Sequence, residues 1–93
     1  MNTKLTVRTE EYTPEYPIGE YIKRWAIQRR INQKEINLEI GYSSSYAIFR
    51  CKGLSVRGLF AVVEFMSKYS SLPEEFYLYR MKQVIKGEYK WRK

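Results

Sequence analysis

Few side chains of this sequence could take part in covalent or acid–base catalysis. The 93 residues include no histidine, and all ten acidic residues are glutamates. The single cysteine, Cys51, and the serine run at 43–45 therefore lack an imidazole that would activate them as nucleophiles. The adjacent Glu74 and Glu75 do not face each other on a helix, and the five glycines are scattered rather than gathered in a phosphate-binding loop. We expect a protein that is not an enzyme and needs no cofactor.

Net positive charge is the main functional indication of the composition. Lysine and arginine number 17 against 10 acids, which gives +7 at neutral pH. The excess is uneven, because residues 1–17 carry −1, residues 18–71 carry +5 and residues 72–93 carry +3. A polyanion fits such a surface, with nucleic acid favoured over an anionic membrane. General solubility is the alternative, since this net charge is normal for a small domain.

The sequence predicts one soluble domain in the cytoplasm. Its length suffices for a single modest core. No apolar run approaches the roughly 18 residues that a membrane span requires, and the start Met1-Asn2-Thr3-Lys4 has no apolar signal segment. We therefore expect no membrane partner. The lone Cys51 excludes an internal disulfide and is predicted to be a small buried hydrophobe.

The first half of the chain predicts an arm and three helices. Leu5 to Thr9 alternates apolar and polar residues before two prolines, which predicts an extended arm or a short strand over 1–17. Asn32, with Glu35 three residues later, predicts a capping box on a short second helix that ends at Gly41. Ser43 or Ser44 can cap a third helix that ends at Gly53, although 46–49 would also suit a strand. Apolar residues at helical spacing predict the first helix over 18–30, namely Ile18, Tyr21, Ile22, Trp25 and Ala26.

The second half predicts two more helices. Ser55 can cap a fourth helix that ends before Pro73, and Glu74-Glu75 can begin a fifth that ends before Gly87. A basic and aromatic tail follows over 88–93. The fourth helix carries one apolar stripe, formed by Val56, Leu59, Phe60, Val63 and Met66. The predicted fold class is therefore all-α, a compact bundle of about five helices with an extended amino-terminal arm or short strand, divided as 1–17, 18–72 and 73–93.

Two short helices around a tight turn at Gly41, followed by a further helix and an apolar one, are typical of a helix-turn-helix domain. Over about residues 18–72 the chain resembles the lambda-repressor and Cro-like helix-turn-helix family, also called XRE-like. The resemblance is carried by Ile22-Lys23-Arg24-Trp25 in the first helix, by 31–36 at the entry to the second, by Ile40-Gly41-Tyr42-Ser43 at the turn, and by 52–66.

The resemblance implies a sequence-selective transcriptional regulator of the repressor type, from a bacterium, a phage or a mobile element, that binds double-stranded DNA as a dimer. It implies that Gln33 contacts the DNA backbone. Family members usually have a small residue where Asn37 stands and an apolar one where Arg50 stands, so we expect Arg50 to reach a phosphate. The residues that would face the major groove are Ser43, Ser44, Ser45, Ile48, Phe49 and Lys52. Only Lys52 among them can form two hydrogen bonds to a base edge, so we expect the specificity to depend partly on DNA shape.

Several basic side chains near helix ends or on polar faces could neutralise phosphates, namely Arg24, Arg29, Arg30, Lys34 and Arg57. The alternative for these residues is a solvated surface. For the serines the alternative is a helix cap, and for Ile48 and Phe49 it is the core or a protein interface.

The last helix is the candidate dimer interface, through Phe76, Leu78, Met81 and Ile85, with packing onto the core as the alternative. A rival function is a protein-binding module on the same scaffold, such as an antirepressor or an inhibitor of a host defence protein. The weak set of base-reading side chains and the nine tyrosines favour this rival. Single-stranded nucleic-acid binding through stacked aromatic residues is a third alternative, which the lack of a predicted sheet disfavours.

Overall fold

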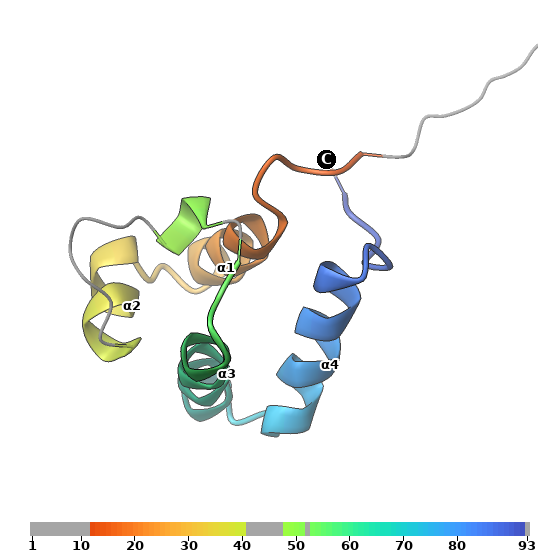
Figure 1. Ribbon diagram of the computed structural model, residues 1–93. Helices are drawn as coiled ribbons and strands as arrows, with labels where there is room; N and C mark the ends of the chain where they lie inside the picture. Colours follow the sequence, from red (N-terminus) through yellow and green to blue (C-terminus); the bar gives the residue numbers. More distant parts are fainter. Residues whose placement is uncertain (1–11, 41–47, 52, 93) are drawn as a thin grey trace, which may run out of the picture.

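A computed structural model describes residues 12–40, 48–51 and 53–92 of the chain. Its elements in order are α1 (Pro17–Gln28), α2 (Gln33–Ile40), the 3-10 turn η2 (Ile48–Arg50), α3 (Val56–Ser70) and α4 (Glu74–Ile85). The predicted all-α class is confirmed, and these residues contain no strand. Figure 1 shows α2 and η2 on one side of α1 and α4 on the other, with α3 between α2 and α4. No helix in the described ranges is long and apolar enough to cross a membrane.

Helix α1 buries the stripe that its spacing predicts: Ile18, Tyr21, Ile22, Trp25 and Ala26 all lie in the core. The helix ends in a Schellman turn. Arg30 adopts a left-handed φ of 60°, and its N–H donates to the carbonyl of Ile27 at 3.1 Å. The N–H of Ile31 donates to the carbonyl of Ala26 at 2.9 Å, and the Ile31 side chain is buried. This turn redirects the chain from α1 into α2. Residues 12–16 of the predicted arm form neither helix nor strand, and residues 1–11 lie outside the described part.

Helix α2 begins with the predicted capping box. The side chain of Asn32 accepts a hydrogen bond from the N–H of Glu35 at 2.9 Å, and the carboxylate of Glu35 accepts one from the N–H of Asn32 at 3.0 Å. Ile36 is buried in the core. The described helix ends at Ile40, so the predicted turn at Gly41 lies outside the described residues.

Only the end of the predicted third helix is described. Its predicted caps, Ser43 and Ser44, lie outside the described residues, and Ile48–Arg50 form one 3-10 turn. Helical conformation ends at Arg50, before the predicted stop at Gly53. Beyond this turn the chain is bonded to α1, since the carbonyl of Cys51 accepts a hydrogen bond from the N–H of Gly19 at 3.3 Å. Cys51 is fully buried, as predicted.

Helix α3 begins at the predicted cap, because the Ser55 hydroxyl accepts a hydrogen bond from the N–H of Gly58 at 3.0 Å. The predicted apolar stripe is partly wrong, since Val56 is 69% exposed and Phe60 is 49% exposed. The helix packs against α2 and against α4, and this rotates its inner face. The buried residues of α3 are Gly58, Val62, Val63 and Met66.

Helix α4 spans the predicted range and is followed by Gly87, which takes a left-handed φ of 76°. Its inner face consists of Tyr77, Met81 and Val84, and it packs against α1 and α3. Met81 is 1% exposed, so its prediction as a dimer contact is wrong; it belongs to the core of one chain.

The other predicted dimer contacts are accessible to different degrees. Phe76 and Ile85 are exposed, at 38% and 59%, and Leu78 is half-buried. They therefore stay available as a surface of α4.

Candidate nucleic-acid interface

The turn η2 lies directly on the first turn of α1, at Gly19. A Cβ atom on Gly19 would be 2.3 Å from the carbonyl oxygen of Phe49 and 2.9 Å from the backbone nitrogen of Arg50. The N–H of Gly19 donates to the carbonyl of Cys51 at 3.3 Å. Ile48 and Cys51, at the two ends of this segment, are both fully buried. The turn is thus held by a backbone contact that only glycine permits.

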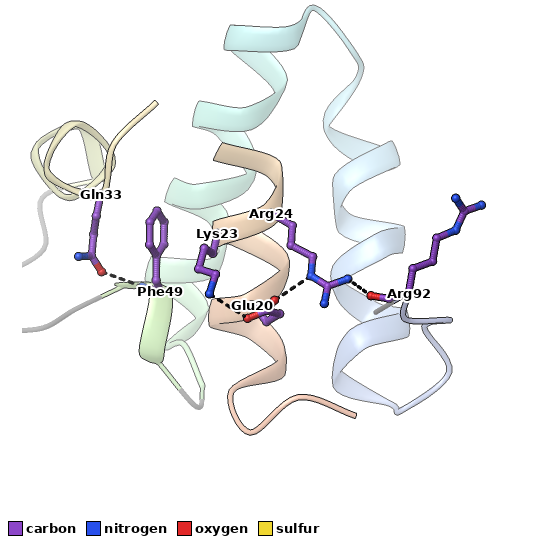
Figure 2. Close-up of polar contacts among 6 residues, drawn as sticks. All are labelled: Glu20, Lys23, Arg24, Gln33, Phe49 and Arg92. Atoms are coloured by element: carbon purple, nitrogen blue, oxygen red, sulfur yellow. Dashed lines mark hydrogen bonds and ion pairs between the residues drawn. The ribbon is translucent and has the colours of Figure 1, made fainter. Parts of the chain in front are cut away.

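A side-chain hydrogen bond joins α2 to the same turn. The Oε1 atom of Gln33 accepts from the N–H of Phe49 at 3.0 Å, as Figure 2 shows. Because Gln33 is the first residue of α2, this bond fixes the start of α2 against η2. The amide NH₂ of Gln33 makes no hydrogen bond to any other described residue.

Lys34 and Arg50 each follow a residue that anchors this edge, and Arg57 is a third exposed cation at the start of α3. Lys34 and Arg57 are the second residues of α2 and α3, and Arg50 ends η2. None of the three forms an ion pair within the described part of the chain. A cation in the first turn adds to the positive end of the helix dipole. Glu35, in the same turn as Lys34, is held by the capping box. Lys34 and Arg50 together exceed Glu35 by one formal positive charge at this edge.

The structure changes the set of groove-facing candidates. Ile48 is 0% exposed, so its prediction as a groove contact is wrong: η2 packs on both α1 and α2, which places this side chain in the core. Phe49 is half-buried and packs against the core, whereas Arg50 is exposed. Ser43, Ser44, Ser45 and Lys52 lie outside the described residues.

Arg24 is not brought together with Gln33, Lys34 and Arg50. Its guanidinium donates to Glu20 at 2.7 Å and to the carbonyl of Arg92, and it lies 5.4 Å from the centre of the Trp91 ring. Figure 2 shows Arg24 reaching from α1 toward the residues after α4. Its predicted role beside the groove is therefore replaced by a contact with the carboxyl-terminal tail.

Glu20 connects two cations on α1. It lies 3.5 Å from the ammonium of Lys23 and 2.7 Å from the guanidinium of Arg24. Partial burial alone would raise the pKa of Glu20, but the hydrogen bond from Arg24 and the charges of Lys23 and Arg24 lower it below its ordinary value. Glu20 is thus ionised at neutral pH and neutralises one positive charge on this side of α1.

The sequence does not reveal the position of two residues of this region. Gly19 is one of several scattered glycines, and a lone glycine in an amphipathic helix does not identify the backbone that approaches it. Asn37 differs from the small residue usual in the family, which does not show whether its side chain is buried. Its Oδ1 atom is buried and finds no hydrogen-bond partner among the described residues.

Comparison of the chain with models of known protein families, with characterised protein sequences and with solved structures finds no match.

Proposed function

We propose that this chain is a sequence-selective, double-stranded DNA-binding transcriptional regulator of the repressor type that acts in the cytoplasm. The observation that carries the proposal is the edge formed by α2 and η2. There Gly19 and Gln33 hold the 3-10 turn, and Lys34 and Arg50 stand exposed without a carboxylate partner in the described part of the chain. A rigid edge with free cations suits the phosphate contacts that fix a protein's register on a duplex.

The proposed roles follow from the chemistry of each side chain. The amide NH₂ of Gln33 donates to a phosphate oxygen, and Lys34, Arg50 and Arg57 supply positive charge to further phosphates. Phe49, together with Ser43, Ser44, Ser45 and Lys52, contacts base edges, as the family resemblance implies. Few of these side chains can form two hydrogen bonds to one base edge. DNA shape therefore supplies part of the specificity.

The protein acts as a two-fold dimer in this proposal. The exposed part of α4, with Phe76, Leu78 and Ile85, is its interface. Two recognition edges related by such symmetry read half-sites about one helical turn apart, or a multiple of that distance.

Selection of the full-length protein against a random duplex library at near-physiological salt tests this function. We expect one two-fold symmetric motif to be enriched. On the selected site, Lys34→Gln, Arg50→Gln and Arg57→Gln should each lower the slope of log affinity against log salt by about one. Lys68→Gln is the matched control, because Lys68 is an exposed cation in the last turn of α3 and lies outside the edge. Enrichment of no sequence would contradict specific DNA binding.

Protein binding is the second candidate, and the exposure of large apolar side chains on α2 and α3 favours it. Leu38 is 75% exposed, Val56 69% and Phe60 49%. If a protein partner is the target, Leu38→Ser and Phe60→Ser abolish its capture, whereas the three cation variants leave it intact. If DNA is the target, the cation variants lose duplex binding and these two variants retain it.

A further inference from the structure

A cleft of about 590 Å³ lies between α1, α4 and the tail that follows α4. It is on the α4 side of α1, whereas η2 lies on the other side (Figure 1). Buried Tyr21, Trp25 and Tyr77 line it. Among the described residues no carboxylate lines the cleft, but five cations do: Arg24, Arg29, Arg80, Lys90 and Arg92. Its volume is within the range of small-molecule sites in proteins.

Aromatic rings, rather than carboxylates, hold two of these guanidiniums. Arg29 lies 4.6 Å from the centre of the Trp25 ring, and Arg80 lies 5.1 Å from that of Phe76. Arg29 also donates to the carbonyl of Trp25, and Arg80 to the side chain of Gln83. Neither forms an ion pair within the described residues. Stacking fixes the plane of each guanidinium and leaves further N–H donors for an anion.

The same two arginines act on one phenol from different helices. Burial is the largest effect on Tyr21 and raises its pKa to about 12, with Tyr89 and Tyr77 adding to the rise. The charges of Arg80 and Arg29 oppose that rise, so both guanidiniums lie within electrostatic reach of the Tyr21 hydroxyl. The phenol stays protonated at neutral pH, and it lines the same cleft as the two arginines.

The tail supplies two aromatic rings beside the cations. Tyr89 and Trp91 are half-buried, and their ring centres are 4.8 Å apart in an edge-on arrangement. Tyr89 also meets the ring of Tyr21 edge-on at 5.3 Å. Rings and guanidinium planes are the surfaces on which nucleobases stack, and guanidiniums bind phosphate through paired N–H donors.

We propose that this cleft binds a nucleotide, with its phosphate bound by Arg29 and Arg80 and its base stacked on one of the rings of Tyr89 and Trp91 while it meets the other edge-on. An acidic peptide would use the cations but leave the aromatic surface unused, and an acyl chain would gain nothing from five cations. The cleft lies on the opposite side of α1 from the proposed duplex edge, although it shares Phe76 with the proposed dimer interface. The nucleotide is free or part of a single strand, and the experiment separates these sources.

Titration of the full-length protein with adenosine monophosphate tests the proposal. The chain has two tryptophans, and both Trp25 and Trp91 line the cleft. Indole fluorescence and the two indole N–H signals in NMR spectra therefore report on it. We expect saturable binding at least about tenfold tighter than that of adenosine or of inorganic phosphate alone, because only the nucleotide uses both features. Much tighter binding of a short single-stranded oligodeoxyadenylate would identify a strand as the source, and equal binding the free nucleotide.

Variants locate the site. Arg29→Gln and Arg80→Gln should each weaken adenosine monophosphate binding at least about tenfold, which is what loss of a charge-assisted contact to phosphate produces. Arg57→Gln is the matched control, because this exposed arginine lies outside the cleft and belongs to the proposed duplex edge. Circular dichroism melts establish that each variant is folded. Absence of saturation with both the nucleotide and the oligomer, equal affinity in all variants, or equally tight binding of polyglutamate would overturn the proposal.

Discussion

The indole N–H of Trp25 donates a hydrogen bond to the hydroxyl of Tyr77 across 3.1 Å of the core. That hydroxyl donates to the Ser70 hydroxyl at 2.8 Å, and Ser70 donates to the carbonyl of Met66 at 2.7 Å. The chain of bonds joins α1, α4 and α3. It satisfies polar groups that burial would otherwise leave without water or a partner.

Tyr77→Phe should destabilise the fold by about 1–3 kcal/mol, because the buried indole N–H of Trp25 loses its acceptor. Chemical denaturation measures the change in the free energy of unfolding. Tyr79→Phe on the same helix is the matched control, since Tyr79 is 60% exposed and its hydroxyl can bond to water. Equal stability of the two variants would contradict the role of this bond.

Gly19→Ala should destabilise the fold by about 1–3 kcal/mol or more, because the added Cβ meets the backbone of η2, which cannot move aside as a flexible side chain would. Helix propensity alone would instead make alanine more favourable by about 1 kcal/mol. The sign of the change in unfolding free energy therefore shows whether the steric clash with η2 or the helix propensity of alanine is the larger effect. Gly53→Ala is the control, because a Cβ there meets nothing within 4 Å.

Two asparagines of the α2 region should respond in opposite directions to alanine. Asn37→Ala removes a buried oxygen without a partner in the described structure, and should stabilise the protein by about 1 kcal/mol. Asn32→Ala removes half of the capping box, and should cost about 1 kcal/mol. Thermal melts of both variants measure the changes. A loss of stability in Asn37→Ala would show that its amide has a partner in the folded protein.

The Cys51 thiol should be unreactive in the folded protein. Burial raises its pKa from an ordinary 9.0 to about 11, which outweighs the lowering by a backbone hydrogen bond. Because the thiolate is the reactive form, a thiol reagent at mildly alkaline pH should modify Cys51 only as fast as the protein opens. The modification rate should rise with denaturant in step with unfolding. Rapid modification of the native chain, at the rate of a free cysteine, would contradict its burial.

Stability should fall in acid partly through Glu20. Its pKa is lower in the folded chain than its ordinary value of 4.5, so the folded state holds its proton less tightly than the unfolded state does. The ionised Glu20 therefore contributes its full stabilisation at pH values above the ordinary pKa of 4.5. This stabilisation is lost as the pH falls through the lowered pKa of the folded chain. Glu20→Gln should flatten the dependence of unfolding free energy on pH in this range. Glu64→Gln, on the exposed face of α3, is the control.

Local signals in the sequence determined most of the helical elements. Asn32 with Glu35, and Ser55 with Gly58, form their caps between residues three positions apart, so the pattern alone contains both partners. The stripe on α1 and the stop at Gly87 follow in the same way from helical periodicity and from a left-handed turn.

Tertiary structure decided which of these residues face outward. Ile48, Met81, Val56 and Phe60 have the same apolar character, yet the first two are buried and the last two exposed. Gly19 matters because η2 lies on it, and Arg24 turns to the tail because the carbonyl of Arg92 lies there. Composition and spacing do not contain these facts. Each depends on a surface supplied by a distant segment, and the packing of α1 against η2, α3 and α4 brings those segments together only in the folded chain.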